Sequence, residues 1–288
     1  MSVRTSPSRQ EIQPFRPPIA AGLALGWILA LLSLGLVVPL LAPLDANQVD
    51  LSARLLPPAG FGGSLEHPFG TDQLGRDLFA RVCSAIRISL LLALVGTVAG
   101  ACLGIALGFA AAHFGGLVDD LVTTLIDFQA ALPFLVLAIA SIAFLGTNIY
   151  VLLLLVSLYG WERYARLARG LALSHRNNRY VTAARTYGAS WPTIYWRHIL
   201  PNVSGILAVN ATLNFPESLL LETTLSFLGL GVQPPNASLG SIMNAGRDHL
   251  FSAWWIAVVP GLLIFFTTFS LSVLGDMLNS GDMAERVA

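Results

Sequence analysis

The densest group of basic side chains in this sequence lies in one segment, between Trp161 and Ile199. That segment holds seven arginines and two histidines against a single acid, Glu162. Cytoplasmic loops of membrane proteins accumulate positive charge, so the segment is predicted to face the cytoplasm. An ordinary positive loop that only orients the chain is the alternative. The seven arginines are Arg163, Arg166, Arg169, Arg176, Arg179, Arg185 and Arg197.

The middle of this segment, residues 179–201, has the pattern of two short helices. Val181–Ala184 is small and helical in character, and Gly188 would end that first helix. Ser190-Trp191-Pro192 is typical of a second helix start, because proline fits the first helical position. The sequence therefore predicts a compact knob of two helices joined at a glycine.

The sequence lacks the residue patterns that nucleotide-binding, metal-binding, redox and hydrolytic sites require. All 16 basic residues are arginine, so a phosphate-binding GxxxxGK[ST] loop cannot occur in this chain. Cys83 and Cys102 have no metal-binding or redox spacing and are expected to be small core residues. No HExxH, GxSxG or clustered Cys/His pattern is present. We therefore expect no enzymatic site, no metal and no cofactor in this chain.

Composition indicates a membrane protein. The chain has 288 residues, of which 55% are hydrophobic and 11% charged, and its net charge is zero. Soluble domains carry about 25% charged residues. The predicted organisation is a cytoplasmic tail over 1–18, an uncleaved first transmembrane helix over 19–44, an external segment over 45–83, a core with five further transmembrane helices over 84–278 that includes a basic loop at 170–200, and a cytoplasmic tail over 279–288.

The second apolar run carries a periodic set of glycines. They recur at every fourth position, so all of them lie near one helical face. Small residues at this spacing let helix backbones approach closely in lipid, which predicts a packing face. The glycines are Gly96, Gly100, Gly104 and Gly108.

The third span, about 121–145, contains a carboxylate and a proline. Asp127 is expected to face protein or water, because a charge at membrane depth is costly. It could line a translocation path, or it could pair with an arginine of the basic loop. Pro133 is expected to kink the helix.

The fifth span is the most polar one. Asn210, Asn214 and Glu217 follow an i, i+4, i+7 spacing and form one stripe, while Glu222 lies about 140° away around the helix. The stripe would either bond to neighbouring helices or line an aqueous cavity that serves as a path or gate. Pro216 is expected to interrupt this helix.

The basic loop resembles a known signature. Ala183-Ala184, three residues, Gly188, eleven residues and Leu200-Pro201 resemble the E-A-A-x3-G-x9-I-x-L-P loop of binding-protein-dependent ABC importer permeases. Thr182 replaces the leading Glu, and His198 stands at the Ile position. The resemblance implies a coupling helix that seats on an ATPase subunit, with the contact carried by Thr182, Ala183, Ala184, Arg185, Gly188, Ala189, Ser190, Leu200 and Pro201.

Two further segments narrow the resemblance to the dipeptide/oligopeptide/nickel branch. HPFGTDQLGRD at 67–77 resembles HPLGTDxLGRD, and 222–235 resembles E-x-x-LSFLGLGVxPP. The first segment would contact an external binding protein, shape an outer gate, or serve only as a structured linker. Its candidate residues are Gly70, Thr71, Asp72, Gly75, Arg76 and Asp77.

The resemblance implies an all-α membrane protein with six transmembrane helices and the type I ABC importer permease fold, the C-type permease subunit of its system. It implies one half of a pore in the bacterial inner membrane, with both termini cytoplasmic. The implied partners are a homologous second permease, two cytoplasmic ATPases that bind the ATP and Mg, an external substrate-binding protein and the lipid bilayer, with no nucleic acid. Di- or oligopeptides are the expected cargo, with nickel or glutathione-like solutes as alternatives. An ion-coupled secondary transporter, using Asp127, Glu217 and Glu222, is the other class considered.

Overall fold

The computed structural model describes residues 18–41 and 45–287, and these residues form helices and turns with no strand among them. The prediction of an all-helical protein is confirmed. Most of the predicted tail over 1–18, residues 42–44 of the first span and Ala288 lie outside the described residues. In chain order the elements are α1 (Pro18–Leu32), η1 (Ser33–Val37), α2 (Val38–Leu41), η2 (Leu51–Ala53), α3 (Leu78–Phe114), α4 (Gly116–Ala131), α5 (Phe134–Leu145), α6 (Ile149–Leu158), α7 (Trp161–Arg176), α8 (Arg179–Thr186), α9 (Trp191–Ile194), η3 (Tyr195–Ile199), α10 (Leu200–Phe227), α11 (Leu239–Gly246), η4 (Arg247–His249) and α12 (Trp255–Val287).

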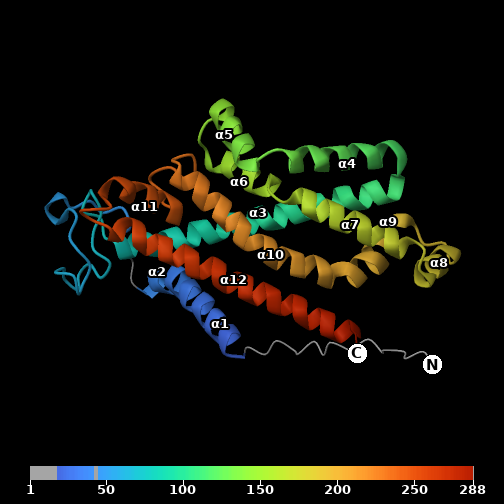
Figure 1. Ribbon diagram of the computed structural model, residues 1–288, viewed down its shortest axis with the longest axis horizontal. Coiled ribbons are helices and arrows are strands. Elements are labelled where there is room, and N and C mark those ends of the chain that lie inside the picture. The colour runs from blue at the N-terminus through green and yellow to red at the C-terminus, as the bar shows by residue number, and fades with distance from the viewer. Residues whose placement is uncertain (1–17, 42–44, 288) are drawn as a thin grey trace, which may run out of the picture.

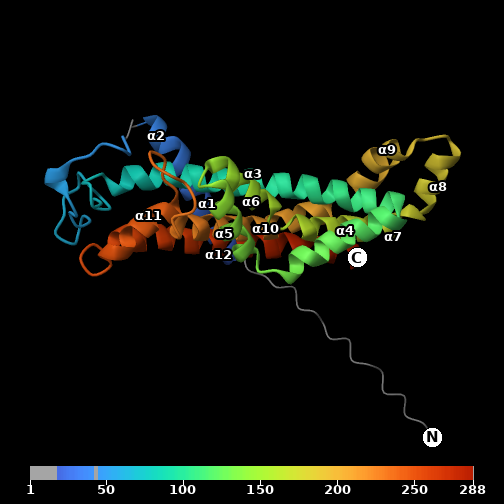
Figure 2. The same ribbon diagram turned by 90° about the horizontal axis from the view of Figure 1, so that it is seen from above.

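The bundle is elongated, and its two ends carry different features (Figure 1). One end carries α8 and α9, and we call it the knob end. The opposite end carries the irregular segment 45–77 together with α11, and we call it the loop end. A view from above places the same elements at the same two ends (Figure 2). Helix α3, which has 37 residues, runs between the two ends.

Among the described residues, three helical segments are long and apolar enough to cross a membrane. They are Ile19–Leu41, which joins α1, η1 and α2, then Leu78–Phe114 and Trp255–Leu278. The bent pair α4–α5 adds a fourth span if its two helices are counted together. Helices also occupy the predicted fourth and fifth spans, as α6 with α7 and as α10.

The glycines of α3 form the predicted packing face. A Cβ on Gly104 would lie 2.3 Å from the carbonyl oxygen of Trp161, and one on Gly100 would lie 2.7 Å from that of Ser157. Both distances are too short for a real side chain, so glycine is what allows α3 to lie against α6 and α7. This contact joins the centre of the bundle into one packed unit.

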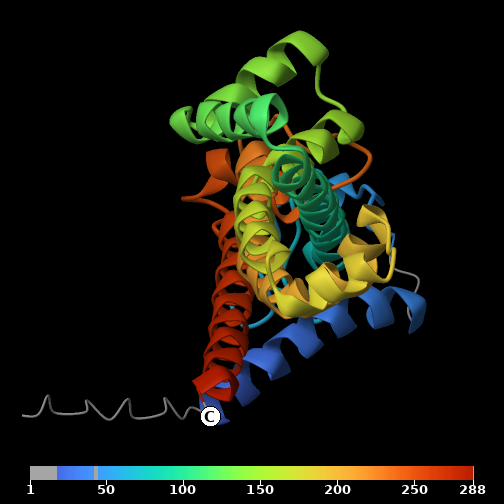
Figure 3. The same ribbon diagram turned by 90° about the vertical axis from the view of Figure 1, so that its right-hand side faces the viewer.

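The chain beyond this centre packs around it. Viewed from the knob end, α1 lies against α12 at the edge of the bundle (Figure 3). Nε1 of Trp27 in α1 donates a hydrogen bond of 3.2 Å to Oγ1 of Thr267 in α12. Since an indole N–H inside an apolar contact needs an acceptor, this bond fixes how the two helices meet.

The predicted third span bends at Pro133 as expected, but as a full break between two helices and not as a kink within one. The segment is two helices, α4 and α5, that meet at an angle of 94°. Leu132 has extended backbone angles (φ −106°, ψ 138°), as expected for a residue before proline. Pro133 then serves as the N-cap of α5 rather than as an interior residue. A proline at this point ends one helix and begins the next.

The expectation that Pro216 interrupts the fifth span is wrong. Helix α10 is continuous from Leu200 to Phe227 with Pro216 inside it. Pro216 is itself buried against the rest of the bundle. Neighbouring helices can satisfy the backbone group that such a proline frees, so packing keeps the helix intact.

The glycine contact generates a stability prediction. We expect Gly104→Ala to lower the free energy of unfolding by about 1–3 kcal/mol, because the methyl group overlaps the backbone of α7. Thermal unfolding of the purified chain in detergent measures the change. Gly26→Ala in α1 is the matched control, since a Cβ there has nothing within 4 Å. Equal unfolding midpoints for the two variants would contradict the assigned contact.

Candidate functional site

The basic segment folds into the predicted two helices joined at a glycine, but the second one, α9, continues through η3 into α10 instead of ending as a short helix. Helix α8 ends at Thr186 and α9 begins at Trp191, with Ser190 as its N-cap. Gly188 has φ +80°, a backbone angle that favours glycine. The amide of Ala189 donates to the carbonyl of Ala184 at 3.0 Å, which closes the turn. We call residues 179–194 the knob.

The knob has an exposed side that faces away from the bundle. Tyr187 at its tip is 92% exposed. Because the tip makes so little contact with the rest of this chain, its surface is available to another protein. The predicted coupling residues on this exposed side are Thr182, Ala183, Arg185, Gly188 and Ser190, whereas Ala184 and Ala189 are half-buried. Leu200 and Pro201 lie beyond the knob, in the first turn of α10.

The opposite side of the knob is anchored in the bundle. Five fully or nearly fully buried side chains, with side chains of α3 and α7 packed against them, join the knob to the start of α10. Two of the α3 and α7 partners are Phe109 and Leu171. The anchor is thus built from helices that also make the glycine contact. We call the five residues the anchor cluster: Val181, Ile194, Ile199, Val203 and Leu207.

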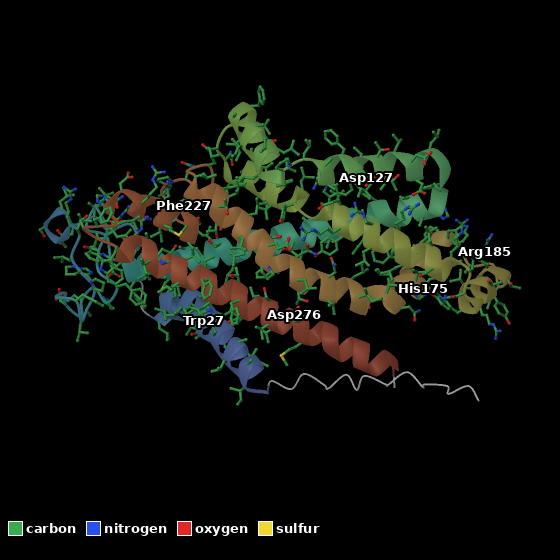
Figure 4. All side chains as sticks on the ribbon, in the orientation of Figure 1. Trp27, Asp127, His175, Arg185, Phe227 and Asp276 are labelled. Atoms are coloured by element: carbon green, nitrogen blue, oxygen red, sulfur yellow. The ribbon has the colours of Figure 1, made fainter. Side chains whose placement is uncertain are left out.

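Polar contacts hold the knob to α7 and α7 to α4. The Nδ1 atom of His175 lies 2.8 Å from the hydroxyl of Tyr180, and burial raises the pKa of that tyrosine. The Tyr180 hydroxyl is therefore neutral across the physiological range. Arg169 binds both carboxylate oxygens of Asp119, which ties α7 to α4. Figure 4 shows His175 and Arg185 at the knob end.

The polar stripe of α10 is bonded to α7. Nη1 of Arg163 donates to Oε2 of Glu217 at 2.5 Å and to Oδ1 of Asn214 at 3.1 Å. The side-chain Nδ2 of Asn214 donates to Oδ1 of Asn210 at 2.7 Å. The hydroxyl of Tyr159 also donates to Glu217, at 3.1 Å. The stripe thus bonds to a neighbouring helix, while the Glu217 side chain stays 41% exposed.

Glu222 and Asp127 lie apart from this stripe. Glu222 is fully buried, and its Oε1 accepts a hydrogen bond of 2.7 Å from Ser226. Its Oε2 has no hydrogen-bond partner among the residues that the structure describes. Asp127 is 79% exposed and lies 3.5 Å from Arg166, which corresponds to the pairing with a basic-loop arginine.

The motif at 67–77 is organised around a buried carboxylate at the loop end. Asp72 is 2% exposed. It accepts hydrogen bonds from Nε of Arg76 at 2.8 Å and from Nη1 of Arg81 at 2.7 Å. The carbonyl of Thr71 accepts a bond of 3.1 Å from Nε1 of Trp255. The motif thereby fixes the first turns of α3 and α12 together. Gly70 and Gly75 have positive φ angles, as their turns require.

Neighbouring charged residues have separate roles in this segment. Arg81, in the first turn of α3, pairs with Asp72 and not with Asp77. Asp77 instead caps α3, since its Oδ2 accepts from the amide of Ala80 at 2.8 Å. Trp255 was not identified at all, because no local signal links it to a loop that precedes it by 184 positions.

Nearby, Asp50 caps η2, and hydrogen bonds from Ser52 lower the pKa of its carboxyl. Across residues 18–41 and 45–287, no group of three or more His, Cys, Asp or Glu side chains could hold a metal ion.

Comparisons with known proteins show which proteins this chain is similar to. Residues 104–281 match the family described as binding-protein-dependent transport system inner membrane component. The chain is 39% identical to the probable D,D-dipeptide transport system permease protein DdpC of Escherichia coli, over 86% of this chain and 82% of that protein. It is 35% identical to the di/tripeptide transport system permease protein DppC of Pseudomonas aeruginosa, over 96% and 91%. It is 34% identical to the glutathione transport system permease protein GsiD of Pectobacterium atrosepticum, over 90% and 84%.

The buried carboxylate at the loop end generates a prediction. We expect Asp72→Asn to lower the free energy of unfolding by about 3–5 kcal/mol, because it leaves the nearly buried guanidinium of Arg81 without its counter-charge. Asp50→Asn is the control, because that side chain lies on the surface and its substitution should change stability by less than about 0.5 kcal/mol. Thermal unfolding in detergent reports both values, and a tolerated Asp72→Asn would refute the assignment.

The α7–α10 ion pair is testable by a double-mutant cycle. We expect Arg163→Ala and Glu217→Ala to couple by up to about 1 kcal/mol in unfolding free energy, because a close pair contributes that much when half exposed. The same cycle on Arg166 and Asp127 should give a value near zero, since both side chains are more exposed and lie 3.5 Å apart. Equal coupling in the two cycles would contradict the assigned role of Arg163.

Proposed function

This chain belongs to the family of binding-protein-dependent transport system inner membrane components. We propose that it forms half of the translocation pathway of a peptide importer, and that ATP hydrolysis by a partner subunit is coupled to transport through the knob. The resemblance drawn from the sequence motifs is confirmed at the level of the family. The chain is accordingly a permease subunit and a multi-pass protein of the inner membrane.

The two-sided knob is the observation that carries the coupling proposal. Its exposed side offers small residues, among them Ala183, on which a flat partner surface can seat closely. Its buried side is locked into the bundle through the anchor cluster. A push on the exposed side would move the knob as a rigid unit, because protein interiors are densely packed and transmit displacement. The bundle would then shift between two arrangements according to the binding energy at this interface.

The partners follow from this coupling. A second, homologous permease completes the pore, and two cytoplasmic ATPases bind the ATP and Mg and dock on the two knobs. An external binding protein delivers the substrate at the loop end. This arrangement would put the knob end and both chain termini in the cytoplasm, which agrees with the seven arginines between Trp161 and Ile199. His67–Asp77 would then be an external surface that braces α3 and α12 near the binding protein.

We propose small peptides as the cargo. The relatives from Escherichia coli and Pseudomonas aeruginosa carry the names of dipeptide and di/tripeptide systems, which supports this assignment. The relative named for glutathione transport supports a second candidate of similar chemistry, since glutathione is itself a small peptide. Of the stripe residues, Glu217, whose side chain is 41% exposed, would present a hydrogen-bonding group to such a solute along α10, while the buried Asn214 would hold Arg163 in place.

The coupling proposal predicts the behaviour of two knob variants. We expect Ala183→Arg to abolish substrate uptake and co-purification of the ATPase, because it places a long charged side chain on the exposed contact side. Gly188→Pro should do the same, because proline cannot adopt φ +80° and the two helices would separate. Membrane insertion and the level of the permease should remain unchanged. Ser174→Arg, on an exposed position of α7 outside the knob, is the control that retains uptake.

Uptake at the wild-type rate by both knob variants would refute the coupling role. The cargo is tested separately, by binding measurements on the external protein that co-purifies with the complex, using dipeptides, tripeptides and glutathione as probes. Binding of glutathione alone would favour the second candidate, and binding of neither class would reject the cargo proposal while leaving the coupling role intact.

A further inference from the structure

An open apolar groove runs along the knob end of α3. It lies between the last turns of α3 and the α9–η3 segment, and its volume is about 690 Å³. Aromatic rings form much of its wall: the rings of Phe109 and Tyr195 are in contact in a tilted arrangement, with centroids 5.3 Å apart. Trp196 and Phe114, which also line the groove, are 72% and 69% exposed. Tryptophan and tyrosine concentrate where a membrane meets water, so this groove has the composition of the bilayer interface.

A polar pocket of about 400 Å³ adjoins the groove. The pocket is lined by side chains of α7, α8 and α9 and contains no acidic residue in its lining: Arg176, Asn177, Thr182, Arg185, Thr186 and Trp191. Both of its arginines are exposed, and between Trp161 and Ile199 the only acid is Glu162. The pocket is therefore strongly positive and offers hydroxyl and amide donors beside the two guanidinium groups.

Trp191 is the wall that the groove and the pocket share. The guanidinium carbon of Arg185 lies 4.7 Å from the centroid of its ring, and that of Arg176 lies 5.6 Å from it. Nη1 of Arg176 also donates to the carbonyl of Ala112 at 3.2 Å, which fixes this arginine against α3. A guanidinium has five N–H donors, so both arginines retain donors for a further anion.

We propose that this composite site binds one anionic phospholipid, with the headgroup phosphate between Arg176 and Arg185 and an acyl chain in the groove along Phe109 and Trp196. The charge of the pocket requires an anion, and the adjoining groove requires that the anion carry a long apolar chain. Free phosphate would leave the groove exposed to water, and a neutral lipid would leave the arginines without a counter-charge. Basic pockets beside transmembrane helices bind anionic headgroups in this manner.

The proposed lipid would touch both the knob and the bundle. Its headgroup contacts α7 and α8, while its chain contacts α3 and η3. The site lies beside the anchor cluster, because Phe109 of the groove also packs against that cluster. The lipid would thus hold the knob against the bilayer surface, and the ATPase would seat on the rest of the exposed side, around Ala183 and Gly188, because Thr182 and Arg185 line the pocket. The inference goes beyond the transport function and does not depend on which solute is carried.

Native mass spectrometry of the purified transporter complex tests the proposal. In separate samples, the complex is transferred into mixed micelles that contain phosphatidylglycerol or phosphatidylcholine, or is kept in detergent with sodium phosphate added to the buffer. The retained mass per permease is recorded for each sample. We expect retention of one phosphatidylglycerol, with no retention of phosphatidylcholine or phosphate. Arg176→Gln and Arg185→Gln should each weaken retention about fivefold, from roughly 1 kcal/mol per basic residue near an anionic lipid.

Trp196→Ala and Arg179→Gln complete the experiment. Trp196→Ala should weaken retention without changing the charge, because it removes part of the groove wall. Arg179→Gln is the matched control: it removes one exposed arginine of α8 that does not line the pocket, and retention should stay at the wild-type level. Equal retention of the two lipids by the wild-type complex would overturn the proposal. So would loss of the ATPase in Arg176→Gln without any change in lipid, since the pocket would then belong to the protein interface while the coupling role stands.

Discussion

The position of the knob depends on the packing of five apolar side chains beneath it. Val181 of α8 and Ile194 of α9 are fully buried, and they meet Ile199, Val203 and Leu207 at the start of α10. Burying a side chain of this size contributes about 1.5–3 kcal/mol relative to leaving it in water. The same contact that holds α8 in place also joins it mechanically to the bundle, while α9 runs through η3 into α10 with helical backbone angles at both junctions. An isolated helix of eight residues does not persist in water, so α8 depends on this anchoring.

From the anchor cluster, a continuous series of close contacts extends to the other end of the molecule. Phe109 and Leu171 link the cluster to α3 and α7, which the glycine face brings into backbone contact. At the loop end, Asp72 and Trp255 fix the first turns of α3 and α12. The bend between α4 and α5 and the exposed Asp127 lie outside this series. A displacement of the knob would therefore also move α3, α7 and α10, which suits a permease subunit.

Local and periodic features of the structure were predictable from the sequence. The glycine face followed from a four-residue repeat, and the two helices of the knob followed from Gly188 and Pro192. The consequences of Pro133 and Pro216 were not predictable, because the same residue ends a helix in one place and is accommodated by packing in the other. The partners of Thr71 and Glu217 lie on helices far away along the chain, and no local spacing relates them. The groove beside the knob was missed for the same reason, since its walls come from α3 and η3.

The most direct measurement of the central claim is cysteine cross-linking between the knob and the ATPase. In a background carrying Cys83→Ala and Cys102→Ala, the variant Ala183→Cys places one thiol on the exposed side of α8. If the knob is the coupling element, a short bifunctional reagent links this position to the ATPase in the assembled transporter, and the yield of the cross-link changes when ATP is added. The same reagent should give no such product from Phe61→Cys at the loop end. A cross-link to the ATPase from Phe61→Cys, or none from Ala183→Cys in an active transporter, would contradict the account.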